Sequence, residues 1–156
     1  MQIDRYGNVN MCCIGDYDQP KVRGPGNVGL VFTGSVQRVL LYVQHHDPRL
    51  FVEKVDFISG PGHPKDPEIL RNRPSWATGP QVCVTPLAVM DFQTPDRRMR
   101  LRSVHPGHTA DEVQNKTGFE LVREGDIPET PPPTEEELRI IREEIDTEGV
   151  LPRLIP

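Results

Sequence analysis

The sequence opens with Gln2-Ile3-Asp4-Arg5-Tyr6-Gly7-Asn8-Val9-Asn10, and after Ile14-Gly15-Asp16-Tyr17 it runs through Pro20-Lys21-Val22-Arg23-Gly24-Pro25-Gly26-Asn27-Val28-Gly29. Short alternating runs on either side of Gly7-Asn8 predict a β-hairpin, because this pair suits a tight turn. The stretch from Gly15 to Gly26 is so rich in glycine and proline that we expect a loop without regular structure. The chain is therefore organised around a hairpin that leads into a glycine loop.

Val36–Val43 carries the strongest strand pattern in the chain. Its near-continuous apolar and β-branched residues predict a strand covered on both faces, as in a parallel sheet with flanking helices. Val82–Thr85 and Leu87–Phe92 also predict strands, and Met99–Val104 alternates as expected of an antiparallel hairpin with one wet face. Arg49–Ile58 is ambiguous between helix and strand, although its end fits a strand better.

Helix signals are confined to three places. Lys65–Gln81 is expected to be irregular, with one helical turn at Glu68–Leu70. Thr109 and Glu112 form a capping-box pattern that predicts a short helix over 110–116, followed by a strand over 119–122. After an extended Pro131–Pro133, Thr134 and Glu137 repeat the capping-box pattern. They predict a helix from about 135 to 146, with Leu138, Ile141 and Ile145 as its apolar stripe.

Composition limits the class of protein. A chain of 156 residues can bury one substantial core, and its longest apolar run is far shorter than the ~20 residues that span a bilayer. The three cysteines are odd in number, and two of them are adjacent, so we expect reduced thiols in a cytoplasmic protein. Residues 120–148 hold eleven acidic and three basic side chains, which argues against nucleic-acid binding.

The motif Gly24-Pro25-Gly26-Asn27-Val28-Gly29 matches the G-x-G-x-x-G spelling of dinucleotide sites. Its flanks do not provide the strand and helix that such a site needs, and Pro25 removes one amide donor. We favour a glycine loop that brings backbone close to another ligand, with Lys21 and Arg23 available for phosphate. A plain surface turn remains the alternative interpretation.

The other candidate groups predict no metal and no catalytic residue. His45 and His46 are adjacent, so on a strand their side chains would point to opposite faces and could not bind one metal ion together. No carboxylate or cysteine lies at the spacing from them that is usual in zinc sites. Cys12 and Cys13 have no base nearby in sequence and are expected to be small buried thiols. Glu53 lies among apolar neighbours, and burial there would raise the pKa of its carboxyl. The alternative is that Glu53 pairs with a basic side chain such as Arg49 or Lys54.

Several longer motifs carry a resemblance to a known family. In order, they resemble the second half of the β subunit of family I coenzyme A-transferases, in the glutaconate CoA-transferase branch. The matching stretches, which cover nearly the whole chain, are Gln2–Asn10, Ile14–Tyr17, Pro20–Arg23, Phe51–Phe57, His105–Gly107, Thr117–Leu121 and Pro128–Leu138.

This resemblance implies an open α/β sheet of the Rossmann-like type with flanking helices, and an active site shared between two similar subunits. It implies that a glutamate attacks an acyl-CoA thioester, that a glutamyl-CoA thioester follows, and that a second acid takes the CoA. The loop residues Gly24, Pro25, Gly26, Asn27 and Gly29 would face the CoA, with Lys21 and Arg23 as phosphate partners. The implied partners are an α subunit and acyl-CoA in a hetero-oligomer, without metal, membrane or nucleic acid.

Two departures from the family pattern stand out. The family's catalytic glutamate lies in a motif upstream of the first stretch matched here, so we expect the N-terminal part of the domain, and the catalytic residue, to be missing. The family loop usually reads Pro-Gly-Ser-Gly-Gly, whereas Val28 replaces a glycine here. Relatives of this fold include a hydrolase that opens steroid rings, and a non-catalytic pairing subunit is a further alternative.

From these observations we expect one partial domain over 1–156. It would comprise sheet and loops over 1–130, a C-terminal helix over 134–146 and a tail over 147–156.

Overall fold

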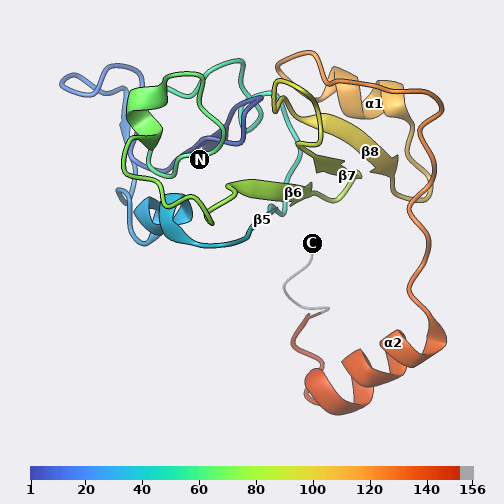
Figure 1. Ribbon diagram of the computed structural model, residues 1–156. Helices are drawn as coiled ribbons and strands as arrows, with labels where there is room; N and C mark the ends of the chain where they lie inside the picture. The colour runs from blue at the N-terminus through green and yellow to red at the C-terminus, as the bar shows by residue number, and fades with distance from the viewer. Residues whose placement is uncertain (152–156) are drawn as a thin grey trace.

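The computed structural model describes residues 1–151 (Figure 1). Its strands are β1 (Gln2–Ile3), β2 (Val9–Asn10), β3 (Cys13–Ile14), β4 (Val22–Arg23), β5 (Val39–Tyr42), β6 (Pro80–Val84), β7 (Ala88–Asp91) and β8 (Arg100–Val104). Its helices are the 3₁₀ turns η1 (Leu30–Ser35) and η2 (Pro67–Leu70), the α-helices α1 (Ala110–Asn115) and α2 (Glu135–Ile140), and the π-helical turn η3 (Ile141–Ile145). The predicted tail over 147–156 lies outside the described residues from position 152 onward.

The N-terminal hairpin is confirmed. Strands β1 and β2 are antiparallel, with Gln2 opposite Asn10 and Ile3 opposite Val9. Gly7 has a φ of 71°, which a residue without a Cβ adopts at little cost. The carboxylate of Asp4 accepts bonds from the amides of Tyr6 and Asn8, so the turn is held by a buried acid.

The loop that follows is more regular than predicted. Strands β3 and β4 form a two-residue antiparallel pair, with Cys13 opposite Arg23 and Ile14 opposite Val22. The prediction of no regular structure between Gly15 and Gly26 was therefore wrong at Val22–Arg23, which forms β4. Gly15, with a φ of 86°, allows the chain to turn back so that the amide of Lys21 reaches the carbonyl of Ile14.

The main sheet has four strands in the order β5-β6-β7-β8, which makes it a mixed sheet of an α/β fold (Figure 1). Strands β5 and β6 are parallel, whereas β6, β7 and β8 form antiparallel pairs in succession. This arrangement confirms the strands predicted near 82–85 and 87–92 and the antiparallel pairing of the segment that ends at Val104. Arg102 is exposed on β8, as expected for a strand with a wet face.

Two sequence predictions about strands were wrong. Leu40 is 68% exposed and Tyr42 is 64% exposed, so β5 is covered on one face and not on both. Arg49–Ile58 forms no strand of its own, and only Phe51 makes an isolated bridge, to Ile3. Backbone groups of this segment instead bond to the N-terminal hairpin. The amide of Ile3 donates to the carbonyl of Leu50, and the amide of Val52 donates to the carbonyl of Ile3.

The core lies on one face of the sheet. It contains the inward side chains of the sheet together with Ile3, Phe51, Val113 and Phe119. Helix α1 contributes Val113, and Thr109 caps it by accepting a bond from the amide of Glu112. The reciprocal half of the predicted capping box does not form, because the Glu112 carboxylate binds His108 and Lys116 instead.

Helix α2 and turn η3 confirm the predicted C-terminal helix, and here both halves of the capping box of Thr134 and Glu137 are present. Neither α2 nor η3 contains a buried residue. Figure 1 shows this helix standing away from the sheet at the end of an extended segment. Among residues 1–151, no helix is long and apolar enough to cross a membrane.

Candidate functional site

The glycine loop is anchored on Met11 and Cys12, the two residues between β2 and β3. The amide of Gly24 donates to the carbonyl of Cys12 at 2.7 Å, and the amide of Gly26 donates to that of Met11 at 3.2 Å. A Cβ on Gly24 would lie 2.2 Å from the Met11 oxygen, so this position has room only for glycine. The two bonds fix the start of the loop and leave the backbone after it free.

Three consecutive amides follow in the loop. The N–H groups of Asn27, Val28 and Gly29 donate to no acceptor among the described residues. Gly26 and Val28 both have positive φ angles, of 91° and 49°, which curl the backbone around these amides. Successive free amides in such a conformation form a concave site for an anion. Val28 incurs a conformational cost here that the glycine of the family pattern would not.

A buried acceptor lies in the same loop. The side-chain oxygen Oδ1 of Asn27 is shielded from solvent and has no hydrogen-bond partner within the described part of the chain. A buried polar atom without a partner costs free energy, so such atoms usually meet a donor from a ligand, a water or another chain. Asn27 therefore combines a free amide with an acceptor that needs a donor.

The two predicted phosphate partners lie on the β3–β4 hairpin. Arg23 donates from Nη2 to the carbonyl of Tyr17 at 2.8 Å, and its guanidinium lies 5.0 Å from the centre of the Tyr17 ring. Lys21 is exposed, and its side chain passes over Gly15. Arg23 is thus committed to its own hairpin, whereas Lys21 forms no ion pair with any residue between 1 and 151.

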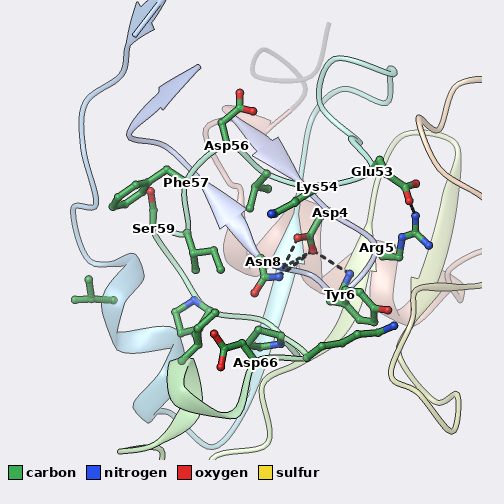
Figure 2. Close-up of a pocket in the computed structure, with 17 residues that line it drawn as sticks. Asp4, Arg5, Tyr6, Asn8, Glu53, Lys54, Asp56, Phe57, Ser59 and Asp66 are labelled. Carbon is green, nitrogen blue, oxygen red and sulfur yellow. Dashed lines mark hydrogen bonds and ion pairs between the residues drawn. The ribbon is translucent and has the colours of Figure 1, made fainter. Parts of the chain in front are cut away.

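A cavity of about 1080 Å³ lies between the N-terminal hairpin, Val31 of η1 and the segments 53–59 and 61–69 (Figure 2). Apolar side chains, including Val55, Phe57 and Ile58, make up much of its wall. Lys54 and Lys65 are exposed at its rim, and the Lys65 ammonium lies 5.4 Å from the centre of the Tyr6 ring. The cavity can therefore take a largely apolar ligand.

The acids around the cavity are engaged by the protein itself. Arg5 and Glu53 form an ion pair, and Asp56 accepts bonds from Gln2 and from the amide of Gly15 (Figure 2 shows the pair). Asp4 is buried beneath the hairpin turn, and desolvation raises the pKa of its carboxyl above the usual value. Asp66 also lines the cavity and accepts a bond from the amide of Glu68. Asp56 and Asp66 have no ion-pair partner among the described residues, so the lining carries both acidic and basic side chains.

The cavity and the glycine loop share supporting residues. The hydroxyl of Ser59, which lines the cavity, accepts a bond from the amide of Met11, whose carbonyl holds Gly26. On the other side, the hydroxyl of Thr33 in η1 donates to the carbonyl of Leu30 and lies 3.3 Å from that of Pro61. The cavity wall is therefore linked to the start of the loop through Met11, although no residue between 24 and 29 lines the cavity.

A model of the coenzyme A transferase family matches residues 1–116, which is well over half of the chain. The chain belongs to the coenzyme A transferase family. It is 35% identical to the B subunit of the 3-oxoadipate CoA-transferase of Pseudomonas knackmussii over 90% of this chain and 54% of that protein. It is 38% identical to the cholesterol ring-cleaving hydrolase IpdB subunit of Rhodococcus jostii over 97% of this chain and 59% of that protein.

The solved structures agree with the family assignment. The crystal structure of glutaconate coenzyme A-transferase from Acidaminococcus fermentans matches 95% of this chain and 56% of its own chain, with a TM-score of 0.80 and 33% identity. The chain thus spans little more than half the length of the relatives it matches. Both the relatives and the fold confirm the resemblance to B subunits of CoA-transferases.

The remaining candidates have structural roles in this CoA-transferase chain. His46 is buried between the hydroxyls of Thr85 and Thr117, and burial lowers its pKa to about 4. Glu53 is exposed, so the interpretation of it as a buried carboxylate was wrong. The alternative, an ion pair with a basic side chain, is present, but its partner is Arg5 and not Arg49 or Lys54. Between positions 1 and 151, no three metal-binding side chains gather.

The sequence did not indicate the cavity. Its walls come from four segments between residues 4 and 69, which are joined only by tertiary contacts. The one available signal was Gly62, whose Cβ would lie 2.3 Å from the carbonyl oxygen of Tyr6 and which therefore marks a close approach of two backbones. A glycine in a stretch with prolines close on either side is more simply interpreted as a turn, so this signal could not be separated from turn chemistry.

Proposed function

We propose that this chain is the B-type subunit part of a CoA-transferase, whose glycine loop binds the thioester carbonyl of an acyl-CoA. The observation that carries the proposal is the set of three consecutive free amides at Asn27, Val28 and Gly29. Backbone amides held in place before the reaction stabilise an oxyanion without reorganisation. The names of the relatives, which include two B subunits of CoA-transferases, support the same reaction class.

In this proposal the nucleophile, a glutamate carboxylate, is supplied by polypeptide outside this chain. The carboxylate attacks the thioester carbon, the carbonyl electrons move to oxygen, and the loop amides donate to that oxyanion. Expulsion of CoA thiolate gives an acyl anhydride, which the thiolate reopens at the glutamyl carbonyl to release the first acid. A second carboxylate then takes the CoA, and the same amides stabilise the oxyanion of each addition step.

The cavity is proposed to hold the acyl group. Its walls are largely apolar, and Ser59 in its lining bonds to Met11, whose carbonyl holds the start of the loop. Coenzyme A is therefore bound as a substrate, with Lys21 as a candidate phosphate partner and Arg23 as a weaker one because Tyr17 already engages it. We further propose a cytoplasmic protein that assembles with an A-type subunit, and its free cysteines support the cytoplasmic location.

A second candidate function is hydrolysis of a CoA thioester, as the name of the Rhodococcus jostii relative indicates a hydrolase for that protein. The loop geometry serves both reactions, because water attack also produces an oxyanion at the thioester carbon. The replacement of a family glycine by Val28 favours neither transfer nor hydrolysis. A third candidate is a pairing subunit without catalysis, in which the loop and cavity would be occupied by another chain.

The test uses the chain assembled with an A-type subunit and a panel of acetyl-CoA, glutaconyl-CoA and 3-oxoadipyl-CoA. Transfer to a second acid produces a new acyl-CoA, measured by chromatography, without release of free thiol. Hydrolysis releases CoA thiol, which a thiol reagent detects. Transfer supports the proposal, thiol release supports the hydrolase, and the absence of both with an intact assembly leaves the pairing role.

A matched pair of variants tests the role of the loop. Gly24→Ala places a Cβ 2.2 Å from the Met11 oxygen, and Gly118→Ala places one 2.3 Å from the Phe51 oxygen, outside the loop. Both variants are expected to lower stability, but only Gly24→Ala displaces the amides. Its activity per folded molecule should fall about 10²-fold, the usual effect of losing an oxyanion donor. Equal losses in both variants would contradict a role for the loop.

A further inference from the structure

A second, smaller hollow adjoins the cavity of Figure 2. It has a volume of about 170 Å³ and lies between η1 and the segment that follows η2. Val31, Pro61 and Ile69 line both hollows, so the two share a largely apolar wall. The polar side chains of the smaller hollow, which we call the side pocket, are Ser35, Glu68, Asn72 and Arg73.

The side pocket is fixed to the glycine loop through η1. This turn begins directly after Gly29, and its six residues span about 12 Å at ~2.0 Å per residue. It is held against Pro61, because a Cβ on Gly34 would lie 3.1 Å from the proline ring and the Thr33 hydroxyl lies 3.3 Å from the proline carbonyl. The loop amides and the side pocket therefore lie at the two ends of one short, well-packed turn.

Arg73 is a cation of the side pocket without a counter-charge. Its Nη2 donates to the carbonyl of Gly62 at 3.0 Å, whereas its Nε is shielded from solvent and has no hydrogen-bond partner among residues 1–151. Desolvation lowers the pKa of its guanidinium, yet arginine keeps its charge in proteins. A partly buried charge that lacks an opposite charge is costly, so Arg73 is poised to bind an anion.

The acids of this region do not supply that anion. The carboxylate of Glu68, the acid in the lining of the side pocket, pairs with Arg71 at 3.4 Å, and both side chains are mostly exposed. Asp66 lines the neighbouring cavity, where its carboxylate accepts a bond from the amide of Glu68. Within the described part of the chain, no carboxylate forms an ion pair with Arg73.

A carboxylate at the end of an apolar chain fits the side pocket. A guanidinium can donate two parallel hydrogen bonds to a carboxylate, which makes this pair both strong and specific. The Ser35 hydroxyl and the Asn72 amide belong to the same lining and are donors for the same kind of group. The shared wall of Val31, Pro61 and Ile69 suits the methylene groups that lead to it.

We infer that Arg73 binds a carboxylate at the far end of the acyl group, so that this site selects CoA thioesters of dicarboxylic acids. The inference rests on the proposed function, because it takes the thioester end of the ligand to lie at the loop amides. Arg73 is a specificity-determining residue in this arrangement and takes no part in bond making or breaking. Its guanidinium neutralises the charge that an acyl group of this class carries into a largely apolar cavity.

The experiment measures binding of two unreactive thioethers to the chain assembled with an A-type subunit. S-(4-carboxybutyl)-CoA and S-pentyl-CoA carry chains of equal length and differ in the terminal carboxylate. By calorimetry, the parent protein should bind the carboxylated thioether about 10-fold more tightly or better, as expected for hydrogen bonds to a charged group. Arg73→Met should abolish this preference and leave the affinity for S-pentyl-CoA unchanged, and Arg73→Lys should retain part of the preference.

Arg102→Met is the matched control, because it removes one positive charge from an exposed position on β8 outside both hollows. It should leave the preference intact. The melting temperature of each variant checks its folding, and the preference of the parent protein needs no variant. Equal affinity of the parent for both thioethers would overturn the inference. A preference that survives Arg73→Met would also overturn it and would assign the carboxylate to Lys54 or Lys65 at the cavity rim.

These outcomes can be told apart from failure of the proposed function. The thioethers have no carbonyl for the loop amides, so their binding does not depend on the proposed reaction. A preference that Arg73→Met abolishes, in a protein that neither transfers nor hydrolyses acyl-CoA, would contradict the reaction and support the role of Arg73. Binding of neither thioether would overturn both the inference and the proposed role of the cavity.

Discussion

His46 makes the stability of this protein depend on pH in a way that can be calculated. The residue is 8% exposed, its Nδ1 lies 2.9 Å from the hydroxyl of Thr85, and its Nε2 lies 3.0 Å from that of Thr117. The Thr117 hydroxyl donates to the carbonyl of Val113, so it must accept from Nε2–H. The Thr85 hydroxyl has one proton and lies 3.3 Å from the carbonyl of Ala88 and 2.9 Å from Nδ1. The shorter distance favours donation to Nδ1, and with it a neutral ring protonated at Nε2.

The magnitude follows from the pKa of this ring. Burial, and to a smaller extent the charge of Lys116, lowers it from 6.5 to about 4, while Asp47 acts in the opposite direction. The unfolded chain therefore binds the proton first, and stability falls as pH drops from about 6.5 to about 4. At about 1.4 kcal/mol per unit of pKa, the free energy of unfolding should fall by about 2 kcal/mol between pH 7 and pH 5.

The assay compares urea unfolding of the parent chain and of His46→Gln at pH 7, 6 and 5. Glutamine keeps a donor and an acceptor but does not titrate, so subtracting its curve removes the contribution of every other group. The difference should shrink by about 2 kcal/mol towards pH 5. A difference that stays constant, or a proton NMR titration of His46 with a midpoint near 6.5, would refute this account of the ring.

Three further predictions concern other parts of the fold. Arg100→Ala should lower the free energy of unfolding by about 3–5 kcal/mol in urea titrations, because the buried Asp91, 2% exposed, loses its ionic partner. The double variant Asp91→Asn with Arg100→Gln leaves no unpaired buried charge and should recover part of this loss. Thr134→Ala removes the hydroxyl that accepts from the amide of Glu137 but keeps the backbone amide that donates to the Glu137 carboxylate. The change should cost the C-terminal helix about 1 kcal/mol, seen as lost helicity in circular dichroism, and unchanged helicity would contradict the capping role. Val28→Gly relieves a φ of 49° and should raise the free energy of unfolding by up to about 1 kcal/mol; a decrease would show that the valine makes a stabilising contact.

Local signals in the sequence predicted much of the fold. The Gly7-Asn8 hairpin and the Thr134 cap could be predicted because each depends on residues within about four positions of one another. The capping box at Thr109 was only half predicted, since His108 and Lys116 compete for the carboxylate of Glu112. Such competition depends on side-chain directions that spacing alone does not give.

The missed features depend on contacts between distant segments. Phe51 looked like part of a strand, but its backbone bonds to Gly118 and bridges to Ile3, and so fastens two other segments. Val36–Val43 was correctly predicted to contain a strand, yet an apolar pattern cannot say whether a second layer is present on the same chain. The cavity was missed for the same reason, because its walls meet only after the hairpin has folded.

The candidate loop was found from its glycines, although the sequence could not show which amides are free. The spelling G-x-G-x-x-G indicated close approach of the backbone, and the bonds of Gly24 to Cys12 and of Gly26 to Met11 explain that need. Asn27 gained importance only with the structure, because burial of its Oδ1 without a partner among the described residues depends on the surrounding packing.

The most direct test of the central claim is hydrogen–deuterium exchange of the assembled subunits with and without acyl-CoA. The account predicts slower exchange at the amides of Asn27, Val28 and Gly29 when the thioester is bound, because these amides then have an acceptor. The amide of the exposed turn at Gly125 serves as a control and should not change. Protection elsewhere in the chain, with unchanged exchange at positions 27–29, would contradict the assignment of this loop to the thioester.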